Sequence, residues 1–402
     1  MYIDAKQEIR QLNRQIRSIM PDVDKFIDTD KVSISEIKEG ALNGEAIRRV
    51  IIILRSTGCN WSLEDHGGCT MCGHLTGTVR GKKISSEMYC KQFDEEMLKY
   101  NFNEYPMLCL YNSGSFLNVN EIPEEAQNYM LSKINQTQGI KRLIIEARPE
   151  FITEESLNKI SILCNKIDVE IGVGLETINE DVRDLCLNKG LLRSDYTLLA
   201  DRVKKHDHIK LLAYVLVKPP FTTEQEGIKD AIESVKFAFD IGFDIVSLEP
   251  VSVQDFTLTS FLQEAGYFRP PWIWSVLEVV KHTCEFGFVR IGGFEFFPIP
   301  KIFTHNCDKC NEKVIRAIKN FNRYYDFSVF EDLTCECIEE WKYDLEEKAS
   351  PIPQKILKVL DNIDKEEIFK KMRMNYDVRG PQSSLIHSII FSTCSGYYIL
   401  NK

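Results

Sequence analysis

The chain has 402 residues, of which 44% are hydrophobic and 27% charged, the balance of an ordinary folded protein with one large domain and a smaller addition. Its formal net charge of −10 argues against a chain-wide attraction to nucleic acid, but it is compatible with a local basic patch. No apolar run reaches the roughly eighteen residues of a membrane span. The charged N-terminus lacks the apolar core of a secretion signal, so we expect a cytoplasmic protein with no membrane partner.

Six short apolar runs alternate with amphipathic stretches along the middle of the chain. Each run is nearly continuous in apolar residues, which is typical of parallel strands covered on both faces. The stretches between them predict helices that include 123–134, 154–166 and 228–240, and Thr153 and Ser156 supply a helix start signal. The predicted strands are 50–54, 107–111, 143–146, 170–175, 211–217 and 245–248.

Six β–α units in succession predict an α/β fold, as a parallel barrel or a doubly wound sheet. A partial (β/α)6 TIM-type barrel with a small C-terminal metal-binding extension fits the count. In such barrels the chemistry gathers at the carboxyl ends of the strands. The predicted domains are an N-terminal helical adaptor (1–45), the partial barrel (46–300), a cysteine-rich, zinc-like segment (301–349) and a C-terminal tail (350–402).

The thirteen cysteines are unevenly distributed. In a reducing compartment, clustered cysteines are more often metal ligands or catalytic groups than disulfides. One group lies within residues 59–72 and a second within 307–337. We expect the isolated cysteines to be small buried hydrophobic residues. They are Cys90, Cys109, Cys164, Cys186, Cys284 and Cys394.

The first group, Cys59, Cys69 and Cys72, lies in a loop directly after the first predicted strand. Several glycines give this loop the backbone freedom to wrap a metal centre. Three thiolates can hold a [4Fe–4S] cluster and leave one iron open to a ligand. A zinc site would need a fourth ligand, which His66 or His74 could supply. The position at the active end of a barrel strand favours the open cluster.

Polar residues follow the next three predicted strands. The small residues 113–115 offer hydroxyl and backbone N–H groups that suit the charged ends of an amino acid, although such turns are common. Glu146 and Arg148 follow the third strand, and Arg148 could clamp a carboxylate. Glu176 follows the fourth. A surface carboxylate is the alternative for any one of them, but three sets in register favour a single site.

Three later segments are candidates for the substrate side. Residues 217–220 and 247–254 end the fifth and sixth predicted strands, and Glu249 and Gln254 are their polar members. Residues 267–274 form an aromatic, proline-stiffened loop. This loop could stack on a base or ring, or it could be a lid packed on the barrel mouth.

The second cysteine group consists of the pairs Cys307/Cys310 and Cys335/Cys337, separated by 24 residues. Four soft ligands in two close pairs are typical of a closed tetrahedral zinc site, and His305 could replace one thiol. A second iron–sulfur cluster and unliganded cysteines are the alternatives. A closed site has no free position for a substrate, so we expect it to pin the C-terminal segment to the barrel.

A three-cysteine loop after the first strand of a partial barrel resembles the radical S-adenosylmethionine (SAM) superfamily. The nine residues between Cys59 and Cys69 depart from its commonest spacing, and Met71 replaces the usual aromatic residue. The longer gap is typical of the branch that includes the Elongator catalytic subunit. The resemblance implies a [4Fe–4S] cluster and SAM as cofactors, an electron donor, and cleavage of SAM to a 5′-deoxyadenosyl radical.

The resemblance also implies contacts to SAM. The turn at 113–115 would receive the amino group, Arg148 would hold the carboxylate, and Glu146 would bond a ribose hydroxyl. It does not identify a catalytic residue. The expected cofactor-binding residues are Ser113, Gly114, Ser115, Glu146, Arg148 and Glu176.

The order of short motifs over roughly residues 40–345 resembles the radical SAM component of archaeosine synthase. The motifs are Cys-x9-Cys-x2-Cys, Ser-Gly-Ser-Phe-Leu, Glu-Ala-Arg-Pro-Glu, Gly-Leu-Glu-Thr, Asn-Lys-Gly, Lys-Pro-Pro, Arg-Pro-Pro-Trp and His-Asn-Cys. This resemblance implies cleavage of a lysine C–N bond on a lysine-modified 7-deazaguanine in tRNA, which forms archaeosine. It also implies a lysine-transferring partner enzyme. The tail after residue 350 lies outside it.

Two other functions stay open at this point. A radical SAM enzyme that acts on a small molecule or peptide would suit the acidic charge better. A scaffold without catalytic activity would use both cysteine groups as structural zinc sites. If tRNA is the substrate, we expect a local basic strip of Arg80, Lys82 and Lys83 beside the cysteine loop.

Overall fold

The computed structural model describes residues 1–23, 27–294 and 297–379. Its centre is one curved sheet in which eight strands follow each other in chain order. The first two strands, β1 (Ile34–Leu42) and β2 (Glu45–Ile53), form an antiparallel hairpin. From β2 onward every neighbouring pair is parallel. The other strands are β3 (Met107–Tyr111), β4 (Arg142–Glu146), β5 (Asp168–Glu176), β6 (Ile209–Val217), β7 (Ile245–Pro250) and β8 (Phe288–Ile291).

The predicted α/β partial barrel is confirmed, because all six predicted strands form and helices separate them along the chain. Two strands were not predicted. β1 lies at the edge of the sheet with most of its residues partly exposed, so it has no continuous apolar run, and β8 has only four residues. The expectation of a helical adaptor over residues 1–45 is therefore wrong for β1, while α1 (Tyr2–Ser18) is helical.

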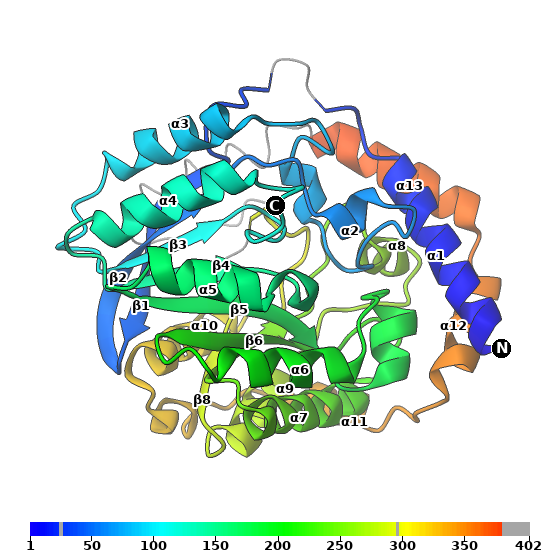
Figure 1. Ribbon diagram of the computed structural model, residues 1–402. Coiled ribbons are helices and arrows are strands. Elements are labelled where there is room, and N and C mark those ends of the chain that lie inside the picture. The colour runs from blue at the N-terminus through cyan, green and yellow to red at the C-terminus, as the bar shows by residue number, and fades with distance from the viewer. Residues whose placement is uncertain (24–26, 295–296, 380–402) are drawn as a thin grey trace.

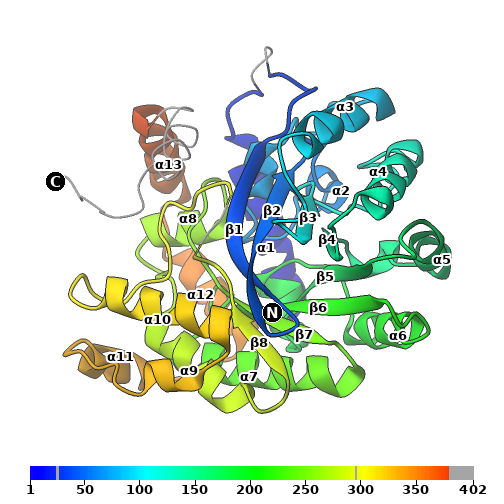
Figure 2. The same cartoon turned by 90° about the vertical axis from the view of Figure 1, so that its left-hand side faces the viewer.

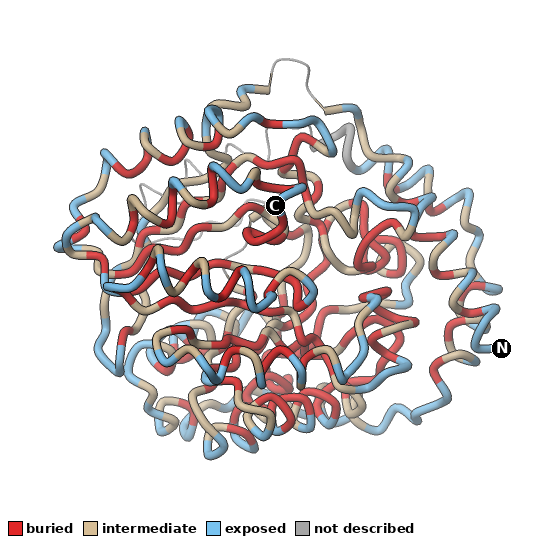
Figure 3. The backbone as a smooth tube through the Cα atoms, viewed as in Figure 1, coloured by how far each residue is buried: buried red, intermediate tan, exposed pale blue. Residues whose placement is uncertain are grey.

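Helices cover the outer side of the curved sheet (Figures 1 and 2). Local signals set where they begin: the Thr153 and Thr223 hydroxyls each accept a bond from the backbone N–H three residues later, as N-caps do. Buried residues gather on the strands and on parts of these helices (Figure 3), and their apolar side chains form the main core. The covering helices are α3 (Ser86–Met97), α4 (Glu124–Gln136), α5 (Glu154–Leu163), α6 (Arg193–Val203), α7 (Glu224–Ile241) and α9 (Ile273–Thr283).

The two ends of the described chain meet in a second, smaller hydrophobic core. There α1 packs against α12 (Ile352–Asp361) and α8 (Leu258–Glu264), and α13 (Lys365–Arg379) packs on α8. Figure 1 shows α1 beside α12 and α13 at one side of the barrel. The tail predicted from residue 350 is thus helical as far as it is described. Cys394 lies outside the described residues.

The remaining elements are short or belong to the second cysteine group. They are α2 (Asn60–Leu63), α10 (Asn311–Tyr324), α11 (Ile338–Leu345) and the single turns η1 (His74–Gly77), η2 (Pro149–Phe151), η3 (Val182–Cys186) and η4 (Phe327–Phe330). In the described part of the chain, no helix combines the length and the apolar character needed to cross a bilayer.

Candidate active site and metal centres

The cysteine loop, residues 56–75, leaves the carboxyl end of β2, so it lies at the end of the sheet where barrel enzymes carry their chemistry. Its three thiols are close enough to interact electrostatically. Burial, with a smaller contribution from Glu121 and the neighbouring thiolates, raises the pKa of Cys59 to about 12, and burial with repulsion from Cys69 raises the pKa of Cys72 to about 11. Three neighbouring thiolates, one buried and two half-buried, repel one another unless a cation lies between them, so this arrangement suits a metal centre.

The three thiols do not have the geometry of ligands to a single ion. Among the described residues, the one group of Cys, His, Asp and Glu ligand atoms that lie within 4.8 Å of each other is elsewhere in the chain. A cubane bonds each thiolate to a different iron and therefore needs a wider spacing than one zinc ion does. The donor set of Cys59, Cys69 and Cys72 therefore suits a cluster, and their spacing does not suit a single shared ion.

Neither histidine proposed as a fourth zinc ligand joins these thiols. The His66 ring stacks on Trp61 with 4.3 Å between the ring centroids. His74 is buried, which lowers its pKa, and it interacts with the backbone of Phe297. Neither belongs to the group of ligand atoms that could share an ion in the described chain.

The turn at 113–115 packs directly against the cysteine loop. A Cβ at Gly114 would overlap the Glu121 carboxylate and lie 3.2 Å from the Cα of Cys59, so only glycine fits there. The Glu121 carboxylate accepts hydrogen bonds from the backbone N–H of Asn60 at 2.9 Å and of Ser115 at 2.5 Å. Glu121 therefore ties the turn to the loop. The sequence did not single it out, because it is one of several acids before α4.

Backbone strain marks the carboxyl ends of three strands. Ser113 after β3, Glu176 at the end of β5 and Lys218 after β6 have φ values of 55°, 64° and 59°. Residues with a side chain rarely adopt this left-handed region, and such strain collects at functional sites. The register of β5 with β6 also shifts between Gly174 and Glu176. All three positions lie at the end of the sheet that carries the cysteine loop.

Arg148 and Glu176 meet beside the cysteine loop through Lys189. The Arg148 guanidinium donates to the Lys189 carbonyl oxygen at 3.1 Å, and Lys189 Nζ lies 2.7 Å from Glu176 Oε1. Arg148 and Lys189 both interact electrostatically with Cys69. Arg148 also pairs with Glu150 at 2.6 Å. The structure thus brings two of the predicted cofactor-binding residues together and adds Lys189 between them.

Glu146 lies in the same interior but bonds another element. Its carboxylate accepts from the Tyr214 hydroxyl of β6 at 2.7 Å, and burial raises its pKa to about 6. Glu249 at the end of β7 accepts from Ser247 at 2.7 Å, and burial raises its pKa to about 7. Glu146 and Glu176 also repel Glu249. The interior beside the predicted SAM contacts therefore holds two acids, Glu146 and Glu249, whose pKa is raised by burial.

Two residues noted only within motifs hold the backbone of the cysteine loop. The Asn188 side chain donates to the carbonyl oxygens of His66 and Gly68, both at 2.9 Å. Gln254 accepts from the backbone N–H of Gly73 at 2.5 Å. Gln254 thus contacts the residue after Cys72. These contacts reach the loop from distant segments, which a sequence motif alone does not reveal.

The second cysteine group forms a closed cluster of four sulfur atoms. Cys307 Sγ lies 3.7 Å from Cys310 Sγ and 3.5 Å from Cys335 Sγ. Cys310 Sγ lies 3.7 Å from Cys337 Sγ. Zinc–sulfur bonds of about 2.3 Å in a tetrahedron place the sulfurs about 3.8 Å apart, so the spacing fits one zinc ion. His305 is not among the grouped ligands, and its Nδ1 faces the Phe303 carbonyl oxygen at 2.8 Å.

The aromatic loop at 267–274 packs against this second group. Trp272 and Trp274 are buried, and their indole N–H groups donate to Asp344 at 2.7 Å and to Cys337 Sγ at 3.3 Å. Arg269 covers the Trp272 ring at 3.8 Å. The two tryptophans therefore pack on the second cysteine group and do not stand exposed for stacking on a base or ring. Tyr267 is 46% exposed.

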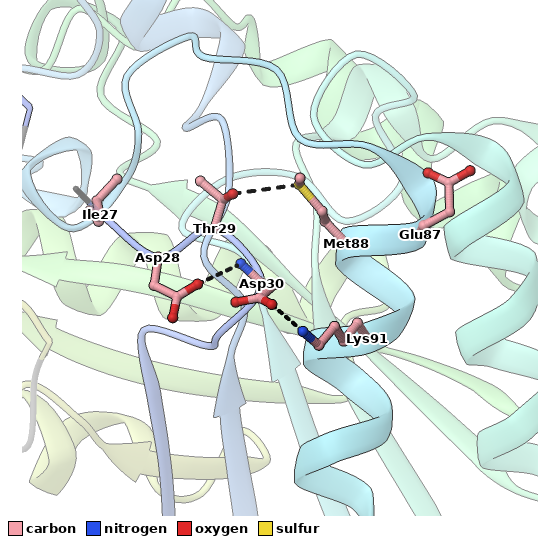
Figure 4. A pocket seen from close by; sticks show the side chains of 7 residues that line it. All are labelled: Ile27, Asp28, Thr29, Asp30, Glu87, Met88 and Lys91. Atoms are coloured by element: carbon pink, nitrogen blue, oxygen red, sulfur yellow. Dashed lines mark hydrogen bonds and ion pairs between the residues drawn. The ribbon is translucent and has the colours of Figure 1, made fainter. Parts of the chain in front are cut away.

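A hollow of about 540 Å³ lies on another surface, between residues 27–30 and α3 (Figure 4). Its side chains include an ion pair between Lys91 and Asp30, and Thr29 faces Met88. No cysteine lines it. It is separate from both cysteine groups and takes no part in the site.

Comparison with known proteins gives three relatives with broad overlap. An uncharacterized protein of Methanocaldococcus jannaschii is 32% identical over 311 residues, covering 73% of this chain and 81% of the relative. Archaeosine synthase subunit beta of Methanosarcina acetivorans is 31% identical over 308 residues, covering 76% and 87%. The Thermococcus kodakarensis protein of that same name is 30% identical over 311 residues, covering 77% and 95%.

No family model matches the chain. Among solved structures, an archaeal Elp3 from Methanocaldococcus infernus with an N-terminal deletion has a TM-score of 0.42 at 16% identity, covering 59% of each chain. This overlap is too low to support an argument about the site.

Proposed function

Because this chain belongs to the archaeosine synthase subunit beta family of radical SAM enzymes, we propose that it cleaves a lysine C–N bond on a lysine-modified 7-deazaguanine in tRNA. The observation that carries the proposal is the cysteine loop. Three thiols, that of Cys69 buried and those of Cys59 and Cys72 half-buried, are spaced too widely for one ion and lie at the carboxyl end of the first parallel strand, with Gly114 packed against Cys59.

In this proposal Cys59, Cys69 and Cys72 hold a [4Fe–4S] cluster, and SAM binds beside it. Together the two groups would supply a 5′-deoxyadenosyl radical for hydrogen abstraction. The protein itself would bind and orient SAM and the substrate and would exclude water from the site. An electron donor is required, and no residue is assigned as catalytic.

The residues around the loop suit the charged ends of an amino acid. Ser113, Gly114 and Ser115 would accommodate the SAM amino group, because Glu121 holds this turn against the loop. Arg148 would attract the SAM carboxylate. Its guanidinium is already paired with Glu150, so the two carboxylates would share one positive charge. Glu146 would bond a ribose hydroxyl. Glu176 would contact SAM while it stays paired with Lys189.

The four-cysteine group would hold zinc as a structural ion. Cys310 and Cys337 immediately precede α10 and α11, so one ion would join both helices. Trp274 links the group to α9. We propose that this ion pins residues 301–349 to the barrel domain of residues 46–300.

The direct test is an anaerobic assay with lysine-modified tRNA, SAM and a reductant, with and without the lysine-transferring partner enzyme. We expect 5′-deoxyadenosine together with archaeosine in the tRNA. Formation of 5′-deoxyadenosine only with small molecules or peptides would replace the substrate assignment. Absence of iron from anaerobically purified protein, with zinc in both cysteine groups, would favour the scaffold.

Binding of tRNA offers a second test, because the chain is acidic overall. Lys82 and Lys83 are exposed, whereas Arg80 donates to the Pro21 carbonyl oxygen and is partly buried. About three phosphate contacts would give log affinity against log salt a slope of about −2 to −3. Neutralising Lys82 and Lys83 should flatten this slope. Lys204 and Lys205 precede β6 at the other end of the barrel and serve as controls.

A further inference from the structure

The N-terminal helix α1 reaches the cysteine loop from outside the barrel. Its buried residues Ala5, Ile9, Leu12 and Ile16 recur every three or four positions, so they form one apolar face. This face lies in the second hydrophobic core with residues of α8 and α12. Two polar residues near the end of the helix, Asn13 and Arg17, face the loop instead.

Asn13 and Arg17 bond the backbone around two of the three cysteines. The Asn13 amide donates to the carbonyl oxygens of Gly67 at 2.9 Å and Gly68 at 3.0 Å. Arg17 Nη2 donates to the carbonyl oxygens of Cys69 at 3.1 Å and Cys72 at 2.5 Å. These carbonyls lie in the irregular stretch between α2 and η1, where backbone groups need partners outside a helix or strand. The Gly68 carbonyl also accepts from Asn188, and that of Cys69 accepts from the backbone N–H of Cys72.

Arg17 also places a positive charge beside the thiols. Its guanidinium interacts electrostatically with Cys72, Cys69 and Cys59, in that order of strength. Its Nη1 atom is buried and has no hydrogen-bond partner among the described residues. A buried donor without a partner is costly, so a negatively charged group in the loop would stabilise it.

The C-terminal helices hold α1 in place. In α12, Ile352, Ile356 and Leu360 are buried in the same small core as the apolar face of α1. Lys365 at the start of α13 pairs with Glu8 of α1 at 2.9 Å. The segment that lies outside the family resemblance therefore supports the helix that carries Asn13 and Arg17.

We propose that Asn13 and Arg17 are positioning residues for the iron–sulfur cluster, and that Arg17 provides the cation that favours its reduced form. This inference rests on the proposed function, because it requires the cluster in the cysteine loop. Asn13 and Arg17 fix the backbone around Cys69 and Cys72, so the thiolates are held in place before the metal binds. The C-terminal helices stabilise the cluster indirectly through α1.

The test compares Arg17→Gln, Arg17→Lys and Asn13→Ala with the parent after anaerobic reconstitution. The readouts are iron and sulfide per chain, the rate at which the cluster's visible absorbance bleaches in air, and the midpoint potential. We expect Arg17→Gln to bleach at least about tenfold faster and to have a lower potential, because the reduced cluster carries more negative charge. Arg17→Lys should keep most of the potential but bleach faster.

Arg14→Gln is the matched control, since Arg14 is exposed on the same helix. Zinc content reports whether each variant is folded at the second cysteine group. If Arg17→Gln loses zinc as well, its fold is disturbed, and the inference is then judged from Arg17→Lys and Asn13→Ala. Variants that match a cluster-bearing parent in all three readouts would overturn this inference alone. A parent without iron would overturn the proposed function and this inference with it.

Discussion

The two cysteine regions differ in how closely their sulfur atoms approach one another and in how the surrounding residues pack. At the four-cysteine group the sulfurs of Cys307 and Cys335 approach to 3.5 Å, and the adjacent helices and tryptophans pack inward. At the cysteine loop the thiols are too far apart for one ion, Glu121 repels Cys59, and strained residues lie at the same end of the sheet. The closed region resembles a folding core, whereas the open region carries features that cost stability.

This contrast follows from what each region has to leave free. In a tetrahedral structural zinc site the protein supplies all four ligands, so metal binding contributes directly to folding. A three-thiolate cluster keeps one position open for a cofactor. Each residue held at positive φ, such as Ser113 or Glu176, costs on the order of 1–3 kcal/mol. The rest of the fold must supply that energy.

The largest expected effect is loss of the open centre. Cys59→Ala, Cys69→Ala or Cys72→Ala should abolish SAM cleavage and reduce iron to background, because three ligands are the minimum for the cubane. The unfolding temperature and zinc content should hardly change. Iron, sulfide and 5′-deoxyadenosine measure this, with Cys90→Ala as control. A variant with all three substitutions that still makes 5′-deoxyadenosine would reject the cluster assignment.

Substitution in the closed centre should act on stability instead. Structural zinc is bound with apparent free energies of roughly 10–16 kcal/mol in small domains, so Cys307→Ala or Cys337→Ala should lose zinc and part of that stabilisation. For a chain of 402 residues, a loss of about 3 kcal/mol would lower the unfolding temperature by about 4 °C. Calorimetry and zinc analysis test this. If the variants melt like the parent but no longer turn over, the second group takes part in the chemistry.

A smaller effect is expected where the open region meets its cofactor. Arg148→Ala and Glu176→Ala should weaken SAM binding about ten- to a hundredfold, since a charged hydrogen bond contributes about 1.5–3 kcal/mol. Iron content should stay constant. Glu155 is exposed on α5, so Glu155→Ala is the control. If both variants bind SAM with the affinity of the parent, the SAM site must lie at the ends of other strands.

The smallest effect sharpens the idea that the open region costs stability. Burial raises the pKa of Glu249 from 4.5 to about 7, so its contribution is favourable below pH 4.5 and is lost as the pH rises through 7. Glu249→Gln should therefore raise the unfolding temperature by a few degrees at pH 8 and by much less at pH 5. Glu155→Gln should show no such pH dependence. Destabilisation at pH 8 would mean that the Glu249 carboxylate is held by partners.

Sequence reasoning found the parts of the molecule that have local signals. The six central strands were predictable because a strand buried on both faces has to be continuously apolar. The cysteine spacing likewise pointed to the four-cysteine group, whose sulfurs the structure brings together. β1 was missed because it alternates at an exposed edge. Glu121, Lys189 and Arg17 were missed because their roles depend on contacts with distant segments.

The central claim is that the cysteine loop holds a cluster with an open iron. Electron paramagnetic resonance of the anaerobically reduced protein, recorded with and without SAM, tests it most directly. We predict a [4Fe–4S]⁺ signal that changes shape when SAM is added, and that is absent when Cys59, Cys69 and Cys72 are all replaced by alanine. No iron–sulfur signal, or one that SAM leaves unchanged, would contradict the claim.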